Sequence, residues 1–360
     1  MKLRLLYFIT SLEIGGAQMG MVRIINSLPR SKYDIKVLSI LSANDVEHKI
    51  DRKFIQVDKL RVSSKTQVYK LISGLLRTIR HFRPHVLVCS LFHATVIGRV
   101  IGTLAKVPVI LNWEHSENFG NCFRRMLNLS TSVFSKHIIA DSLFVYGATT
   151  KLIKHPDKVS ILPIGSVDLK LYSPAERRSA QKVVRIGSIG SLREVKNFSF
   201  LIELAKCLPD VCFVEIAGNG PQFNRLRRMI NDNRLENRVY LRGQVEDTPS
   251  FLSRLDIYVQ PSLWEGLCIS VVEAAASGLP ILASNVGGIP ETVKNGYNGF
   301  LVVPGDLEGF KEKLLKLVSD SDLRKNMGAN SRALAEEKYP LDKMVDKFDT
   351  LITTLVRDRI

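Results

Sequence analysis

The sequence predicts an α/β protein made of two Rossmann-like, doubly wound domains. Its 360 residues are too many for one ordinary hydrophobic core and suit two domains of about 150–180 residues each. Two series of short apolar runs, each alternating with amphipathic stretches, follow one another along the chain, which is the pattern of two parallel sheets with crossover helices. The net charge also changes sharply between the two halves, as expected for domains that meet different partners.

Runs of apolar, β-favouring residues mark the expected strands, because parallel strands that helices cover on both faces are apolar throughout. In the first half these runs are Arg4–Thr10, Tyr33–Leu41, Phe54–Val57, Val86–Ser90, Val109–Trp113 and His137–Ala140. Stretches with helical periodicity lie between them at Met19–Leu28, Thr66–His81 and Ala94–Ala105.

The second half repeats this alternation. Its expected strands are Val183–Ile189, Val211–Ala217, Arg238–Leu241, Ile257–Gln260 and Ile281–Ala283. Its expected helices are Phe198–Cys207, Pro221–Asn231, Ile269–Ser277 and Leu307–Ser319, followed by a last helix at Leu341–Arg357. Pro163, Gly165 and Pro174 interrupt the pattern between the halves. We therefore expect domains at residues 1–165 and 183–340, a linker at 166–182, and a C-terminal helical segment at 341–360.

The positive charge is concentrated in the first half. The chain has 51 Lys and Arg and 35 Asp and Glu, a net charge of +16. Residues 1–165 contain 24 basic and 10 acidic residues, a net charge of +14, whereas residues 166–360 contain 27 and 25, a net charge of +2. A basic half favours an anionic partner, which could be phospholipid headgroups, a polyprenyl-phosphate carrier or nucleic acid.

The composition also indicates a cellular compartment. The five cysteines are odd in number, scattered and not in metal-ligand spacing, which is typical of a reduced, cytosolic protein. No apolar run reaches the roughly 18–20 residues that span a bilayer. No Asp-x-Asp sequence stands at the end of an expected strand, so nothing in the sequence suggests a divalent metal.

The clearest local chemistry follows the expected strand at Ile257–Gln260, where a glycine-containing loop leads into a helix. The residues concerned are Glu265, Gly266, Leu267, Cys268 and Glu273. The glycine allows a ligand to approach the backbone closely, and the free N–H groups at the start of the helix can bind an anion without a cationic side chain. A nucleotide diphosphate is the natural occupant.

Two acidic residues flank this helix start. Glu265 and Glu273 would repel phosphate, but each can accept hydrogen bonds from hydroxyl groups, one from a sugar ring and the other from a ribose. The alternatives are a helix N-terminal charge for Glu265 and a solvated helix face for Glu273. The second alternative is weakened because the neighbours of Glu273 are apolar, and a carboxylate in that setting needs a partner.

Two other strand-to-helix loops carry candidate residues. Arg193 and Lys196 follow the first strand of the second half, at the carboxyl end of the sheet, where open α/β sheets bind ligands. They could neutralise a leaving diphosphate or be ordinary surface charges. Gly15 and Gly16 follow the first strand of the chain and indicate either close approach of a phosphate or a tight turn into a helix.

Taken together, these residues resemble the retaining, metal-independent glycosyltransferases of the GT-B fold, in the large family four group. The similarity covers nearly the whole chain. Its motifs are the Gly15-Gly16 loop, Gly218-Asn219-Gly220-Pro221, Pro261-Ser262, the Glu-x7-Glu segment from Glu265 to Glu273, Gly287-Gly288-Ile289-Pro290-Glu291 and Asn295-Gly296-Tyr297-Asn298-Gly299-Phe300-Leu301-Val302. Each motif alone is a weak signal, but their order and spacing are specific.

The resemblance implies two domains that face each other across a cleft, with the last helix crossing back to the first domain. The N-terminal domain would bind the acceptor and the C-terminal domain the nucleotide sugar. By position, Glu273 would bind the ribose, Glu265 the hydroxyls of the donor sugar, and Lys196 the diphosphate. The family commonly has Arg where this chain has Ser191, and Arg193 could supply that charge.

His115 matches a histidine that family members place near the transferred sugar. The alternative is a satisfied histidine at the end of a strand. Glu265 and His115 are therefore the expected catalytic residues. The expected donor-binding residues are Gly15, Gly16, Arg193, Lys196, Gly266, Leu267, Cys268 and Glu273.

The expected reaction moves a hexose or aminohexose from a UDP- or GDP-sugar by front-face attack, with retention and with neither a metal nor a cofactor. In the transition state the protein would mainly stabilise the charge growing on the diphosphate. Glu265 would orient the sugar rather than bond to it. A nucleotide-sugar epimerase or a phosphorylase on the same fold is the enzymatic alternative. A basic nucleic-acid-binding protein is less favoured, because the cations are not interleaved with aromatics in a recognisable module.

The acceptor is expected to be a lipid-linked sugar or a polysaccharide, because such a partner fits the basic first half best. Thr66–Arg83 and Phe119–Lys136 combine apolar stripes with cations, and docking on an anionic inner leaflet would suit them. Both apolar stripes are nevertheless expected to pack on the sheet, with the cations in solvent. The expected location is cytoplasmic, peripheral at the inner face of the plasma membrane.

Overall fold

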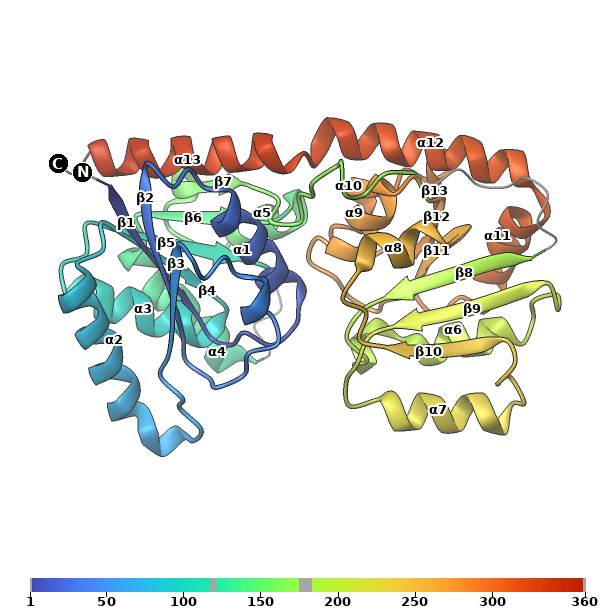
Figure 1. The fold of residues 1–360 in the computed structure, drawn as a ribbon, viewed down its shortest axis with the longest axis horizontal. Helices are drawn as coiled ribbons and strands as arrows, with labels where there is room; N and C mark the ends of the chain where they lie inside the picture. Colours follow the sequence, from blue (N-terminus) through green and yellow to red (C-terminus); the bar gives the residue numbers. More distant parts are fainter. Residues whose placement is uncertain (1, 117–120, 175–182, 359–360) are drawn as a thin grey trace. The chain divides into compact units, whose positions relative to one another are not determined.

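The computed structural model describes residues 2–116, 121–174 and 183–358. The chain divides into two compact units (Figure 1): unit 1 contains residues 1–164 and 341–360, and unit 2 contains residues 165–340. Residues 175–182 of the expected linker, Phe119 of the second amphipathic stretch and the last two residues of the C-terminal segment lie outside the described residues.

The sheet of unit 1 has seven parallel strands in the order β3-β2-β1-β4-β5-β6-β7. The strands are β1 (Leu3–Ile9), β2 (Tyr33–Ser39), β3 (Ile55–Lys59), β4 (Val86–Ser90), β5 (Val109–Glu114), β6 (His137–Ala140) and β7 (Val159–Ile161). The first six match the predicted strands closely. The seventh was not predicted, because three residues are too few to show a period. The chain reverses its direction of travel across the sheet between β1 and β4, which is the point where such sheets bind ligands.

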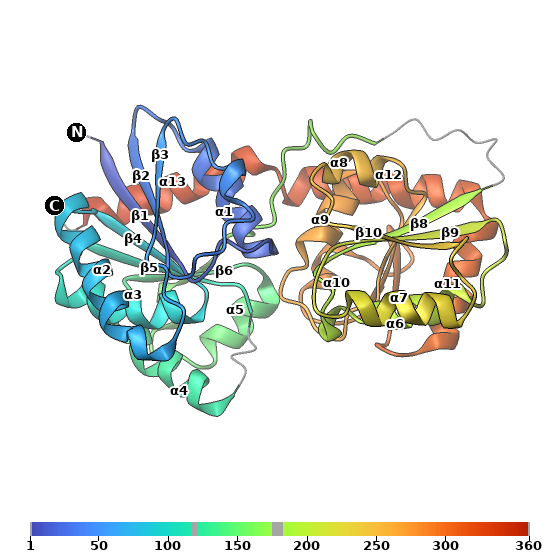
Figure 2. The ribbon, with the colours of Figure 1, turned by 60° about the horizontal axis from the view of Figure 1, so that its bottom comes forward.

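Helices cover both faces of this sheet, α1 and α13 on one face and α2, α3 and α4 on the other (Figure 2). The helices of unit 1 are α1 (Gly16–Ser27), α2 (Val68–Phe82), α3 (Phe92–Leu104), α4 (Cys122–Thr131), α5 (Leu143–Thr150) and α13 (Leu341–Arg357). In α13, the buried Phe348 packs on Trp113 with ring centroids 5.2 Å apart, and Asp349 accepts hydrogen bonds from Tyr33 and Lys32. A helix from the end of the chain therefore completes the core of unit 1.

The two amphipathic stretches of unit 1 differ in what they bury. Leu71, Leu75 and Ile79 of α2 are buried, so the predicted packing of that stripe on the sheet is confirmed. The prediction is wrong for α4, because Phe123 is 60% exposed and Met126 is 57% exposed. The reason is that α4 buries polar residues instead, which serve as hydrogen-bond partners for a buried arginine described below.

The sheet of unit 2 has six parallel strands in the order β10-β9-β8-β11-β12-β13, with its reversal between β8 and β11. The strands are β8 (Val184–Ile189), β9 (Cys212–Ala217), β10 (Val239–Gly243), β11 (Ile257–Gln260), β12 (Ile281–Ser284) and β13 (Gly299–Val302). The last strand was not predicted, because it begins with a glycine inside a turn-rich motif. Two parallel sheets with alternating helices confirm the predicted α/β fold class.

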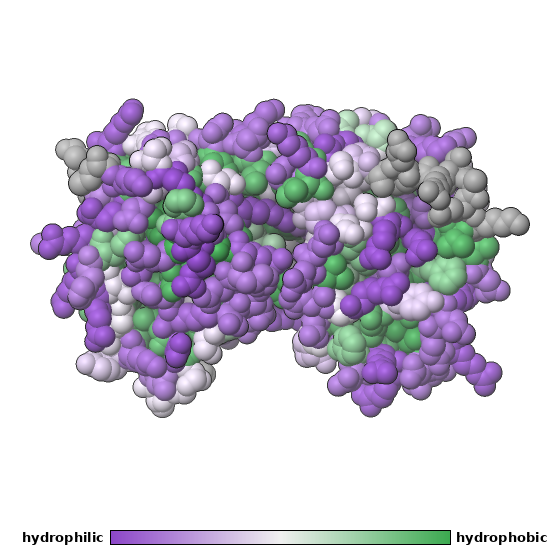
Figure 3. Space-filling model, viewed as in Figure 1, coloured by the Kyte–Doolittle hydropathy of each residue, from purple (hydrophilic) through white to green (hydrophobic). Residues whose placement is uncertain are grey.

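The helices of unit 2 pack on both faces of its sheet. They are α6 (Phe198–Ala205), α7 (Phe223–Asp232), α8 (Thr248–Ser253), α9 (Ile269–Ala276), α10 (Ile289–Thr292), α11 (Leu307–Ser319) and α12 (Ser321–Lys338). The longest, α12, packs on α9. It was not predicted, because several of its buried residues are small (Gly328, Ser331 and Ala335) and it has no strong apolar stripe. The face shown in Figure 3 is mainly hydrophilic, with apolar side chains in small separate groups.

Candidate functional site

The sheet reversal in unit 2 brings a lysine and a glutamate together. Lys196 ends the short 3-10 turn after β8, and Glu265 lies in the loop after β11. The Lys196 Nζ atom lies 2.6 Å from Glu265 Oε1, and their side chains are 19% and 8% exposed. Burial alone would lower the pKa of Lys196, but the Glu265 carboxylate outweighs it and the pKa is raised. Lys196, which was predicted to bind the diphosphate, and Glu265, which was predicted to bind the donor sugar, therefore form one largely buried ion pair.

Side chains of β11 and of the loop after it form a chain of hydrogen bonds that ends at Glu265. The Ser262 hydroxyl donates to Glu265 Oε1 at 2.7 Å, and the Gln260 amide donates to the Ser262 hydroxyl at 2.8 Å. The Tyr258 hydroxyl in turn donates to Gln260 Oε1 at 2.9 Å. Glu265 Oε2 accepts no hydrogen bond from the part of the chain that the structure describes, so this oxygen is available for a ligand hydroxyl.

Backbone donors lie beside this pair at the start of α9. The N–H groups of residues 267–270 make no hydrogen bond with any described residue, although Leu267 and Cys268 are only 3% and 5% exposed. The first N–H groups of a helix have no partner within the helix, and here two of the four belong to buried residues, so this end of α9 can bind an anion. Burial raises the pKa of the Cys268 thiol to about 12, so this residue contributes its backbone rather than a thiolate.

Two glycines set the shape of the loop that contains Glu265. Gly287 has a φ of +55°, and a Cβ atom there would lie 1.8 Å from the Glu265 carbonyl oxygen. Gly288 donates its N–H to the Gly266 carbonyl at 2.7 Å, and a Cβ atom at Gly288 would lie 2.3 Å from that oxygen. The Gly-Gly motif is therefore required by close backbone packing behind the Glu265 loop.

Glu273 lies farther along α9 and is 7% exposed. The alternative of a solvated helix face is therefore wrong. The Tyr172 hydroxyl donates to Glu273 Oε1 at 3.0 Å, which supplies the partner that a buried carboxylate needs. Tyr172 could not be singled out from the sequence, because it is 101 residues away from Glu273 in the chain and belongs to no motif.

The remaining donor-site candidates, Arg193, Gly15 and Gly16, show fewer specific contacts. The Arg193 side chain is exposed and makes no hydrogen bond or ion pair with a described residue. In unit 1, Gly15 is the N-cap of α1 with an extended backbone, φ −170°, which any residue can adopt. Gly16 begins the helix directly after it. Gly15 and Gly16 therefore form the turn into α1, next to the sheet reversal of unit 1.

His115 follows β5 and has partners on both ring nitrogens. Its Nδ1 atom lies 2.7 Å from Asp141 Oδ2, and its Nε2 atom lies 2.7 Å from the Ser90 hydroxyl. The Trp113 indole N–H donates to the other Asp141 oxygen at 2.5 Å. Ser90 ends β4 and Asp141 follows β6. Neither was singled out from sequence, although the carboxyl ends of three expected parallel strands had to meet at one sheet edge.

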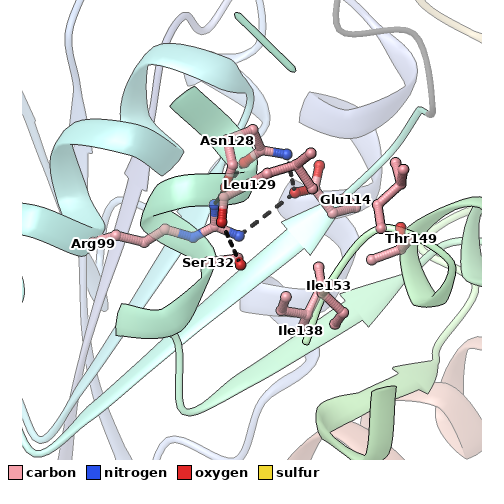
Figure 4. Close-up of a pocket in the computed structure, with 9 residues that line it drawn as sticks. Arg99, Glu114, Asn128, Leu129, Ser132, Ile138, Thr149 and Ile153 are labelled. Atoms are coloured by element: carbon pink, nitrogen blue, oxygen red, sulfur yellow. Dashed lines mark hydrogen bonds and ion pairs between the residues drawn. The ribbon is translucent and has the colours of Figure 1, made fainter. Parts of the chain in front are cut away.

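A buried arginine anchors the end of the strand that carries His115 (Figure 4). Arg99 is 1% exposed and lies 3.6 Å from Glu114, and it donates to both the carbonyl and side-chain oxygens of Asn128 in α4. Burial lowers the pKa of Arg99, and Glu114 acts in the opposite sense. The cavity beside these residues has a volume of about 10 Å³, which is the room of one water molecule rather than of a sugar. This network is structural.

The described residues contain neither a metal-binding cluster nor a membrane-spanning helix. No group of three or more His, Cys, Asp or Glu side chains in residues 2–116, 121–174 and 183–358 is arranged to hold a metal ion. No helix in the same residues is both long and apolar enough to cross a membrane.

The comparisons with known sequences find glycosyltransferases. Residues 173–334 match the family model of the glycosyl transferases group 1. The chain is 27% identical, over 95% of both chains, to UDP-Gal:alpha-D-GlcNAc-diphosphoundecaprenol alpha-1,3-galactosyltransferase of Escherichia coli. It is also 26% identical to N-acetyl-alpha-D-glucosaminyl L-malate synthase of Bacillus anthracis, over 76% of this chain and 73% of that one.

The comparisons with solved structures show the fold. HepE of Anabaena in complex with UDP-glucose has a TM-score of 0.87 and 19% identity, over 98% of this chain and 99% of that chain. Sucrose-phosphate synthase from Thermosynechococcus elongatus has a TM-score of 0.84 and 15% identity, over 99% and 100%. The chain is therefore a glycosyltransferase with the GT-B fold, in which residues 173–334 match the glycosyl transferases group 1, and the predicted resemblance to GT-B glycosyltransferases is confirmed.

Proposed function

We propose that this glycosyltransferase moves a hexose or aminohexose from a UDP-sugar to a sugar linked to a lipid diphosphate, with retention and without a metal ion. The observation that carries the proposal is the row of unpaired backbone donors at residues 267–270, beside the Lys196–Glu265 pair. The name of the Escherichia coli relative specifies UDP-Gal and a GlcNAc-diphosphoundecaprenol acceptor, and HepE was solved with UDP-glucose. Both support the choice of substrates, and a GDP-sugar is the alternative donor.

The donor would lie across the start of α9. The backbone donors of residues 267–270 and the Lys196 ammonium would bind the diphosphate, with the exposed Arg193 as a further cation. Glu265 Oε2, which accepts no hydrogen bond from a described residue, would accept one from a hydroxyl of the donor sugar. Glu273 would accept one from the ribose, as the resemblance implies. Because Gly266 has no side chain, the diphosphate could approach the backbone closely there.

The chemistry would be a front-face substitution at the anomeric carbon. The bond from that carbon to the diphosphate oxygen breaks, the bond to the acceptor oxygen forms on the same face, and the acceptor proton passes to the departing phosphate oxygen. Fixed donors that stabilise the charge on the diphosphate lower the barrier, because they need not reorganise during the reaction. His115 would lie near the transferred sugar. Gly15 and Gly16 would allow close approach of the donor phosphate to the backbone.

The acceptor would reach unit 1 from an anionic membrane surface. The exposed apolar side chains of α4, Phe123 and Met126, flank Arg124 and Arg125. Apolar side chains that insert beside cations favour an interface with anionic lipid. Unit 1 also contains most of the excess positive charge of the chain. We therefore place the enzyme at the cytoplasmic face of a membrane, held there peripherally.

Binding and transfer can be tested in two steps. A thermal-shift panel of UDP- and GDP-sugars identifies the donor, and incubation of that donor with a short-chain polyprenyl diphosphate sugar tests transfer. We expect a UDP-sugar to stabilise the protein and the product to have the anomeric configuration of the donor, assigned by NMR. Stabilisation by GDP-sugars alone, an inverted product, or donor breakdown at the same rate without acceptor would each contradict the proposal.

A substitution of Glu273 tests the proposed ribose contact. Glu273→Ala should weaken donor binding about 10- to 100-fold, because it removes a hydrogen bond to a charged acceptor. Tyr172→Phe is the matched control, since it removes one protein hydrogen bond to Glu273 and keeps the carboxylate. Isothermal titration with UDP measures both variants. Equal donor affinity in Glu273→Ala and the unmodified protein would refute the ribose contact.

A further inference from the structure

A cleft in unit 1 lies between the edge strand β3 and helix α2, outside the donor site. Its volume is about 450 Å³, which is within the range of small-molecule sites. Three cationic side chains line it, those of Lys59, Arg61 and Arg77, together with the carboxylates of Glu47 and Asp58. Lys59 is the last residue of β3, so the cleft reaches the edge of the sheet at which α/β proteins bind ligands.

Both carboxylates of the cleft already have cationic partners. Glu47 forms ion pairs with Lys59 and Arg52, and one oxygen of Asp58 lies 2.8 Å from Lys36 Nζ. Because each acid is neutralised by a neighbouring cation, the acids do not oppose the binding of an anion in the cleft.

The two arginines of the cleft have no such partner. The side chains of Arg61 and Arg77 are exposed and make no hydrogen bond or ion pair with any residue that the structure describes. The backbone around Arg61 is nevertheless fixed. The Leu60 N–H donates to the Ser39 carbonyl at 2.8 Å, and the Lys70 ammonium donates to the Arg61 carbonyl at 3.2 Å. Guanidinium groups offer paired donors that match the oxygens of a phosphate group, so the cleft suits a phosphate-bearing ligand.

The cleft also has an apolar wall, to which Leu38, Val57 and Leu60 contribute. Val68 and Tyr69, in the first turn of α2, are 49% and 83% exposed. Helix α2 lies on the same face of the sheet as α4 (Figure 2), whose exposed apolar side chains are proposed to meet the membrane. Guanidinium groups beside apolar side chains favour an anion with an apolar tail over inorganic phosphate.

We propose that the cleft between β3 and α2 is a binding site for a lipid diphosphate, with Arg61 and Arg77 on the diphosphate and the lipid chain on the apolar wall. The source of this group is the lipid-linked acceptor, so the inference rests on the proposed function and adds the place where unit 1 holds its acceptor. Headgroups of anionic phospholipids share the phosphate chemistry, and the experiments below distinguish the two sources.

Binding can be measured without any transfer reaction. Isothermal titration with farnesyl diphosphate, at saturating UDP to fill the donor site, measures the affinity of the cleft. Arg61→Gln with Arg77→Gln should weaken binding about 10- to 100-fold, because hydrogen bonds to charged groups are lost. Arg80→Gln with Lys106→Gln is the matched control, since both residues are exposed in unit 1 and the same charge is removed. The control should bind like the unmodified protein, and inorganic pyrophosphate should bind more weakly than farnesyl diphosphate because it has no tail.

A transfer assay gives a second readout. The double arginine variant should raise the KM for a polyprenyl diphosphate sugar about 10- to 100-fold, with kcat and the affinity for UDP unchanged. An alkyl glycoside of the same sugar lacks the diphosphate, so its KM should be the same in the variant and the unmodified protein.

The proposal is overturned if the unmodified protein does not bind farnesyl diphosphate at saturating UDP, or if the double arginine variant binds it like the control. If that variant loses sedimentation with phosphatidylglycerol vesicles but keeps its affinity for farnesyl diphosphate, the cleft binds phospholipid headgroups and the acceptor assignment is wrong. Arginine-dependent binding without transfer of any sugar would refute the proposed function and leave the site standing. Transfer with an unchanged KM in the variant would refute the site alone.

Discussion

At the residue scale, Gly287 makes the most specific demand on the donor site. Its positive φ would cost another residue about 1–2 kcal/mol, and a Cβ atom would also collide with the Glu265 carbonyl. Gly305 has a φ of +81° with nothing within 4 Å of an added Cβ, so it incurs the first cost without the second. Gly287→Ala should therefore lower the free energy of unfolding more than Gly305→Ala, by about 1–3 kcal/mol, and weaken UDP binding. Urea unfolding and UDP titration measure both effects, and equal losses in the two variants would contradict the steric argument.

The residues that sequence alone could identify are those with a local reason for their identity. Lys196, Glu265 and the residues before α9 stand at strand ends, where the strand order of an α/β sheet places ligands. Their direct pairing could not be read from the chain, because Lys196 and Glu265 are 69 residues apart. Asp141 and Tyr172 were missed for the same reason: each acts on a predicted residue from a distant part of the chain.

At the scale of elements, α2 and α4 show how far a periodic pattern can be trusted. Both have apolar stripes, but only α2 buries its stripe. The reason lies outside α4: the buried Arg99 donates hydrogen bonds to Asn128, and this turns the polar face of α4 inward. A pattern identifies an amphipathic helix, while the identity of the neighbouring side chain decides which face is covered.

The exposed face of α4 leads to a test of membrane binding. Replacing Phe123 and Met126 together with Ser should reduce sedimentation with vesicles that contain anionic lipid, because insertion of apolar area is lost. Val303→Ser is the matched control, since Val303 is 65% exposed and belongs to unit 2. We expect the control to sediment like the unmodified protein. Equal sedimentation of all three proteins would remove the membrane argument, whereas the donor site in unit 2 would be unaffected.

At the scale of the whole molecule, the two units have separate cores, and the last helix belongs to the first of them. The alternation of strands and helices was sufficient to predict both sheets, since parallel strands and their crossovers leave strong periodic signals. The order of the strands and the location of α13 depend on contacts between distant segments, such as Phe348 with Trp113.

This division predicts that core damage stays within one unit. Phe348 in α13 and Phe310 in α11 are both 0% exposed, so Phe→Ala at either position should destabilise its own unit by about 3–5 kcal/mol. Hydrogen exchange should then show faster exchange of β1 and β5 amides in Phe348→Ala, with β8 and β11 little changed, and the reverse in Phe310→Ala. Because Phe348 is near the end of the chain, an effect on the first strand would demonstrate that the C-terminal helix stabilises unit 1. Loss of protection in both sheets from either substitution would instead mean that the units unfold as one.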